Sequence, residues 1–160
     1  MRVLLAVLVS GTVAFAQAPA VPATSRTMVS AAEVAAMMAK AKAERKDQPN
    51  IAQSMLQLAP YNVSLEYRAS VGNAAVHETE AELFYVVDGS ATLVTGGTLT
   101  DSTRNGANLT GKTIQGGTSR KVAKGDFIMV PEGQPHWFSA IDGTVVLMSL
   151  HLPHAASTAK

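Results

Sequence analysis

The sequence predicts an all-β domain, a sandwich or barrel, that follows one N-terminal helix. From Ile51 onward, apolar and polar residues alternate with a period of two in short runs, and turn-forming residues separate these runs. One stretch with helical spacing precedes them. The 160 residues, 47 % of them hydrophobic, suffice for a single domain with a sizeable core.

The first 16 residues are typical of a secretory signal peptide. A positive start at Arg2 leads into the apolar run 3–9, and Ala14-Phe15-Ala16 forms a small-x-small cleavage pattern. The apolar run is too short to span a bilayer. We therefore expect an exported protein, periplasmic or secreted, without integral membrane association. Residues 17–29 are expected to form a flexible N-terminus.

Residues 31–45 are predicted to form a helix. Ser30 and Glu33 have the spacing of a capping box, and basic residues gather near the C-terminal end, where they suit the helix dipole. We expect this helix to pack on the β-domain or on a partner subunit. A position on a membrane surface is the alternative.

Short β-segments follow to the end of the chain. The predicted strands are 55–58, 61–68, 74–77, 82–87, 90–95, 113–115, 121–123, 127–130, 136–139 and 144–152. Turns are predicted at Asp88-Gly89 and Asp142-Gly143, among others. The polar segment 98–111 is expected to be a long surface loop or an extended hairpin tip.

Charge and composition exclude several classes of protein. Thirteen Lys and Arg stand against 12 Asp and Glu, and only 5 % of residues are aromatic, so we expect no nucleic-acid partner. Cysteine is absent, which excludes disulfides and thiolate metal sites. Metal ligands would have to be carboxylates or the four histidines, His77, His136, His151 and His154.

His77 and Glu82 can converge although they are five residues apart. On one straight strand they would face opposite sides, but residues 78–81 can form a turn, so that His77 ends one strand and Glu82 begins the next. Glu82 would then share a face with Phe84 and Val86. A carboxylate beside so apolar a strand needs a metal ion or a cationic partner.

His136 stands behind the rigid segment 131–135, at the start of a predicted strand, with Phe138 on the same face. Taken alone, each histidine is more often a hydrogen-bonded structural residue than a ligand. The sequence contains no G-x-S-x-G element and no phosphate-binding loop of the Walker type.

These stretches resemble the cupin superfamily. Its second motif, G-x5-P-x-G-x2-H-x3-N, is matched by Gly125, Pro131, Gly133 and His136, with Ala140 in place of Asn. Its first motif, G-x5-H-x-H-x3,4-E-x6-G, is matched in its second half by His77, Glu82 and Gly89. Ala75 stands where the first histidine would be. The resemblance implies a double-stranded β-helix, a conical jelly-roll barrel with a metal or ligand site inside.

The resemblance also implies a ligand set. The family's usual site has three histidines and one glutamate, and this chain offers His77, Glu82 and His136 as ligands of a divalent ion: Fe, Mn, Ni or Zn. No cofactor other than this ion is expected, and no catalytic residue is assigned.

Four further residues near the motifs have less defined roles. Glu78 or Glu80 could stand in for the missing histidine, the alternative being solvated loop carboxylates. His151 lies on the last predicted strand, and alternation alone does not fix which face of the strand it occupies. It is a candidate to contact the ligand side chains rather than the ion. His154 is expected in an exposed tail.

The chain is thus expected to comprise a signal peptide (1–16), a flexible N-terminus (17–29), an N-terminal helix (30–50), a cupin β-barrel (51–153) and a C-terminal tail (154–160). The favoured function is an exported metal-binding cupin that acts on or binds a small molecule. Three versions stay open: a metalloenzyme such as an oxygenase, isomerase or lyase, a ligand-binding module without turnover, and a structural cupin with a degenerate site. The resemblance also implies a homodimer paired through sheet edges, with strand 61–68 as the candidate edge.

Overall fold

The computed structural model describes residues 25–154. The predicted signal peptide, most of the predicted flexible N-terminus, and residues 155–160 of the tail lie outside the described residues. Among the described residues, no helix is both long and apolar enough to cross a membrane.

The described chain is one helix followed by β-structure. The elements are α1 (Ala31–Glu44), β1 (Asn50–Leu58), β2 (Tyr61–Arg68), β3 (Ala74–His77), β4 (Glu80–Thr95), β5 (Thr98–Leu99), β6 (Thr103–Asn105), β7 (Asn108–Gly111), β8 (Ile114–Gln115), β9 (Thr118–Ala123), β10 (Phe127–Val130) and β11 (His136–Pro153). The capping box is confirmed: the Glu33 N–H donates to Ser30 Oγ at 3.2 Å, and the Ser30 N–H donates to Glu33 Oε2 at 2.7 Å.

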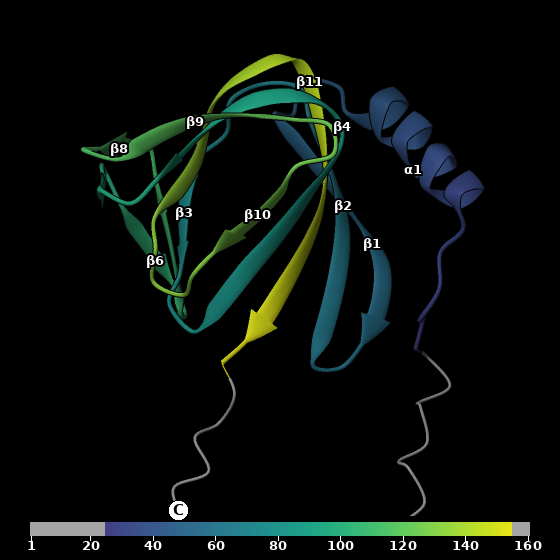
Figure 1. The fold of residues 1–160 in the computed structure, drawn as a ribbon, viewed down its shortest axis with the longest axis horizontal. Coiled ribbons are helices and arrows are strands. Elements are labelled where there is room, and N and C mark those ends of the chain that lie inside the picture. The colour runs from purple at the N-terminus through teal and green to yellow at the C-terminus, as the bar shows by residue number, and fades with distance from the viewer. Residues whose placement is uncertain (1–24, 155–160) are drawn as a thin grey trace, which may run out of the picture.

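Two long strands, β4 and β11, pair with each other and run through both halves of a jelly-roll barrel (Figure 1). In one half, β2 pairs with the second part of β11 and β1 pairs with β2, while β10 pairs with the first part of β4. In the other half, β9 pairs with the second part of β4, and β3, β7 and β6 extend from the start of β11. The predicted all-β jelly-roll barrel with one N-terminal helix is confirmed.

Two predicted turns are wrong. Asp88-Gly89 and Asp142-Gly143 lie inside the continuous strands β4 and β11, which bend together there. Gly89 has a φ of +79°, and a Cβ at this position would stand 1.9 Å from the carbonyl oxygen of Thr144. The register shifts in β11 between Ile141 and Val145. Gly89 therefore permits a bend in the two paired strands, and neither Asp-Gly dipeptide reverses the direction of the chain.

The polar segment 98–111 contains the β6–β7 hairpin, which extends the sheet beside β3. Of the two alternatives expected for this segment, the hairpin is the correct one. Asn108 pairs with His77 in the β3–β7 ladder, so the hairpin brings its polar side chains to the end of β3.

Strand 61–68 is not a sheet edge. It forms β2, which lies between β1 and β11, because β1 starts at Asn50 and covers its outer side. Arg26 in turn bridges to Gln57 on β1. The suggestion that this strand joins two subunits is therefore wrong, and homodimer formation itself stays a prediction.

Two apolar clusters hold the fold together. The inner cluster fills the space between the two halves of the barrel and consists of Phe84, Val86, Ala91, Leu93, Val122, Val130, Phe138, Val145 and Leu147. The outer cluster lies between α1 and the outer face of β1, β2 and β11, and Ala41 of the helix is 1 % exposed within it. The helix therefore packs on the barrel, as expected.

We predict that Leu147→Ala lowers the free energy of unfolding by about 2–5 kcal/mol, because Leu147 is fully buried in the inner cluster and the neighbouring strands cannot collapse into the gap. Urea denaturation followed by circular dichroism measures this cost. The control is Met129→Ala, at a side chain that is 53 % exposed, which should change stability by about 0.5 kcal/mol or less. Equal costs for the two variants would contradict the assignment of the inner cluster as the core.

Candidate metal centre

His77 ends β3 and directs one ring nitrogen into the barrel. Its Nδ1 lies 2.9 Å from Asn108 Oδ1, which fixes the ring from the β7 side. With an amide oxygen as acceptor, Nδ1 carries the proton and Nε2 is left as a lone-pair donor. His77 Nε2 is 3.3 Å from Glu82 Oε2.

Glu82 is the buried centre of the cluster, with only 3 % of the residue exposed. It shares the inner face of β4 with Phe84 and Val86, as predicted. The Ser149 hydroxyl of β11 donates to Oε1 at 2.6 Å. The other oxygen, Oε2, is buried and accepts no well-formed hydrogen bond, although two imidazole nitrogens stand close to it.

His136 starts β11 and approaches Glu82 from the opposite half of the barrel. Its Nε2 is 3.1 Å from Glu82 Oε2, and the residue is 5 % exposed. The turn before it is tied to β3, because the Gly133 N–H donates to the carbonyl oxygen of His77 at 2.7 Å. The three predicted ligands His77, Glu82 and His136 thus meet in one place.

His151 joins this cluster and faces its interior, a question that the sequence left open. Its Nε2 is 3.4 Å from Glu82 Oε1, and its ring stands edge-on to the His77 ring with centroids 4.6 Å apart. Glu80 Oε2 lies 3.1 Å from its Nδ1 and orients the ring. Leu147, Ser149 and His151 alternate along the strand, so the sequence places them on one face. Only the register of β11 against β4 shows that this face points inward.

The remaining candidates do not supply a replacement ligand. Ala75 pairs with His136 in the β3–β11 register and offers no donor. Glu78 is held outside by Arg104, whose Nη2 lies 2.9 Å from its Oε1. Glu80 positions His151. His154 is exposed, as expected, and pairs with Glu132 at 2.9 Å.

The electrostatics of the cluster favour an anionic carboxylate. Burial alone would raise the pKa of Glu82. Contacts with the His136 and His77 rings and with the Ser149 hydroxyl outweigh this effect and bring the pKa well below its usual range. The contact with Glu82 in turn raises the pKa of His77, against the opposing effect of burial. A negative charge held in an apolar interior attracts a cation.

The donor set fits a divalent ion. Ligand atoms about 2.0–2.2 Å from one ion stand about 3.0–3.6 Å from their neighbours, and the separations of 3.1, 3.3 and 3.4 Å from the Glu82 oxygens fall in this range. Donor atoms of His77, Glu82 and His151 all lie within 4.8 Å of one another. His136 is not part of that mutual set, but it makes the shortest contact with Glu82. His77, Glu82 and His151 therefore form the mutually close set, and His136 adds a further donor beside Glu82 Oε2.

Comparison with known proteins identifies related folds. A family model described as Cupin matches residues 41–159. The comparison with curated protein sequences found no significant match.

Among solved structures, the hydroxypropylphosphonic acid epoxidase of S. wedmorenis is 14 % identical, with a TM-score of 0.51 over 66 % of this chain and 51 % of that one. The structure of FeII HppE is 13 % identical, with a TM-score of 0.50 over 65 % of this chain and 51 % of that one. The Cnp3 cupin domain of Schizosaccharomyces pombe is 12 % identical, with a TM-score of 0.46 over 66 % of this chain and 62 % of that one. This chain thus spans about half of the epoxidase and HppE chains, and the similarity establishes the fold.

We predict that Ser149→Ala lowers the free energy of unfolding by about 1–3 kcal/mol in chelator, because the buried Glu82 carboxylate loses its one well-formed hydrogen bond. Urea denaturation measures the loss. The control is Ser139→Ala on the same strand, where the hydroxyl donates to Thr92 O at 3.4 Å and the expected cost is about 1 kcal/mol or less. A Ser149 cost no larger than the Ser139 cost would contradict a structural role for this bond.

Proposed function

Because this chain belongs to the cupin family, we propose that it binds a divalent metal ion at His77, Glu82, His136 and His151 and takes up a small molecule in the barrel beside that ion. The observation that carries the proposal is the buried Glu82 Oε2 atom, which has no hydrogen-bond partner and lies within 3.3 Å of two imidazole nitrogens. Iron, manganese, nickel and zinc suit a site of imidazoles and one carboxylate. Of these, iron is the metal of the FeII HppE structure, which shares the fold.

The residues around the cluster hold its donors in place. Asn108 and Glu80 contact the Nδ1 atoms of His77 and His151, so the Nε2 atoms of both rings face inward. Ser149 fixes the carboxylate through Oε1. When bound, a divalent ion supplies Lewis acidity and a place for an oxygen of the small molecule.

One side of the cluster is apolar, while the His77 and His151 side chains stay 18 % and 31 % exposed. The Phe84 ring lies 5.9 Å from the His136 ring, and both side chains are buried beside the inner cluster. In such a setting, charged and polar contacts with a bound molecule are stronger than in bulk water. This favours a role in which a small molecule is held and polarised.

One observation favours a second candidate function. Ala75 occupies the position of the family's usual first histidine, and it provides no ligand there. A binding or structural cupin with weakened metal affinity would have the same barrel and the same polar cluster. Metal content separates this candidate from the first.

We also propose that the protein is exported. The support is the pattern of residues 1–16, with its positive start, apolar run and small-x-small site. Expression of the full chain in a bacterium with a periplasm, followed by N-terminal sequencing, should find a periplasmic protein that starts near Gln17. A cytosolic protein that retains residues 1–16 would contradict export.

We predict that the purified protein carries about one equivalent of divalent metal, and that His77→Ala or His136→Ala abolishes it, because each variant removes a donor facing Glu82. His151→Ala should weaken metal affinity by about 10-fold or more. Elemental analysis after dialysis and competition with a chelator measure these changes.

The matched control for the metal experiment is His154→Ala, which removes an exposed imidazole outside the cluster and should leave the metal content unchanged. A wild-type protein without metal, whose Tm is the same with and without chelator, would contradict the metal proposal. That result would favour the binding or structural cupin.

A further inference from the structure

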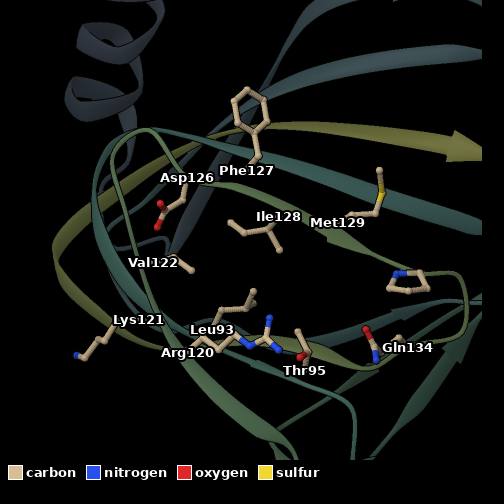
Figure 2. Close-up of a pocket in the computed structure, with 11 residues that line it drawn as sticks. Leu93, Thr95, Arg120, Lys121, Val122, Asp126, Phe127, Ile128, Met129 and Gln134 are labelled. Carbon is tan, nitrogen blue, oxygen red and sulfur yellow. The ribbon is translucent and has the colours of Figure 1, made fainter.

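The barrel is open between β9 and β10. These strands follow each other in the chain but pair with different parts of β4: β9 with Ser90–Thr95 and β10 with Glu82–Tyr85. Within residues 25–154, neither strand has another partner, and the two diverge from the turn at Gly125. A cavity of about 450 Å³ lies between them (Figure 2). Its volume is that of a small-molecule site.

The floor of this cavity is the core of the barrel. Leu93 and Val122 belong to the inner cluster, and Ile128 packs against it. Phe127 and Met129, which are 69 % and 53 % exposed, stand along the rim. The cavity is therefore apolar below and accessible from the side.

One end of the cavity adjoins the metal centre. Thr95 lines this end and lies directly opposite His136 in the β4–β11 register. Gln134 lines it too, and its carbonyl oxygen is 3.4 Å from His136 Nδ1. Pro131 follows Val130, which lies opposite Glu82. The four cluster residues do not line the cavity themselves, so a molecule in it would approach His136 and Glu82 past Thr95, Gln134 and Pro131.

Arg120, an exposed side chain, places a cation on the wall of this cavity. It lies opposite Leu93 in the β4–β9 register, so it shares the inward face of β9, and its guanidinium lies between Leu93 and Thr95 (Figure 2). Within the described residues, Arg120 forms no ion pair with a carboxylate. The one acidic lining residue, Asp126, accepts a hydrogen bond from the Ala123 N–H at 2.8 Å and closes the turn at the far end.

The charge in the cavity suits a carboxylate. A guanidinium presents paired N–H donors that match the two oxygens of a carboxylate. Lys121 also lines the cavity, but its side chain extends away from Leu93 and Thr95, so Arg120 is the cation beside these two residues (Figure 2). A phosphate monoester, with nearly two negative charges, would call for a second cation.

The distance to the metal centre suits a short molecule. Arg120 and His136 are two strands apart and offset by two residues, so their Cα atoms lie about 12 Å apart, given a strand spacing of about 4.8 Å and a rise of about 3.4 Å per residue. Side chains that reach inward from both ends leave room for a ligand with a chain of a few atoms.

We infer that the cavity between β9 and β10 binds a small organic acid whose carboxylate pairs with Arg120, while an oxygen at its other end reaches the cluster around Glu82. The contact between the ligand oxygen and the cluster rests on the proposed function. The contact between the ligand carboxylate and Arg120 requires no metal ion.

The experiment uses the full chain and a series of 2-hydroxy dicarboxylates of increasing length, from malate to 2-hydroxyadipate. Each is compared with the 2-hydroxy monocarboxylate of equal length by isothermal titration calorimetry. At the best length, the second carboxylate should tighten binding by about 2- to 5-fold, because Arg120 is exposed and solvent screens the pair. Arg120→Gln should remove this gain, and Lys121→Gln, which changes the net charge equally, should retain it.

Two further measurements separate this inference from the proposed function. The metal content of Arg120→Gln should equal that of the wild type, because Arg120 lies outside the ligand cluster. In chelator, the Arg120-dependent preference for the dicarboxylate should persist with weaker overall binding. If metal is absent but this preference remains, the metal proposal fails and the carboxylate site stands.

Two results would overturn the inference. One is a metal-loaded protein in which Arg120→Gln and Lys121→Gln bind the dicarboxylates equally well. The other is an Arg120-dependent preference for a phosphate monoester of matched length over the dicarboxylate, which would replace the assigned ligand class.

Discussion

The pairing of β4 with β11 is the interaction on which the rest of the structure depends. The two strands remain partners from Glu80 opposite Pro153 to Thr95 opposite His136. Their joint bend, at Gly89 and beside Val145, folds this ribbon into an arch (Figure 1). Both ends of the arch therefore meet, and β11 contributes a histidine from its start and another from near its end to the same carboxylate. The same bend sends β9 and β10 to separate parts of β4 and opens the side of the barrel.

The buried charge of Glu82 is the main energetic cost of this arrangement. A carboxylate that is 3 % exposed is destabilising unless hydrogen bonds or opposite charges offset its lost hydration. One oxygen has the Ser149 hydroxyl, and the other has only imidazole nitrogens at poor hydrogen-bond geometry. The three rings are in turn held by Asn108, Glu80 and the carbonyl of Gln134. These contacts order the donors before any ligand arrives, which lowers the entropic cost of binding.

Local patterns in the sequence predicted much of the fold and most of the cluster. The strand bounds 61–68, 74–77 and 127–130 agree with β2, β3 and β10, and the capping box correctly marked the start of α1. The convergence of His77 with Glu82 followed from the turn between two strands. The two errors, the Asp-Gly turns and the edge assigned to 61–68, share one cause with the open question of the His151 face: all three depend on which strands become neighbours. The register between strands that are distant in the chain cannot be read from a local sequence pattern.

The sequence by itself determined the class of fold, the residue types open to a metal site, and three of the four side chains that meet in the cluster. Alternation, turn residues and the absence of cysteine suffice for the first two, because they act within a few residues of one another or on composition, whereas the set of three side chains came from the resemblance to the cupin motifs. The tertiary structure decided the rest. It brought in His151 from the last strand, left Oε2 of Glu82 without a hydrogen bond, and opened a cavity beside Arg120. These features come from the bend and register of β4 against β11, which set distances between residues up to about 70 positions apart in the chain.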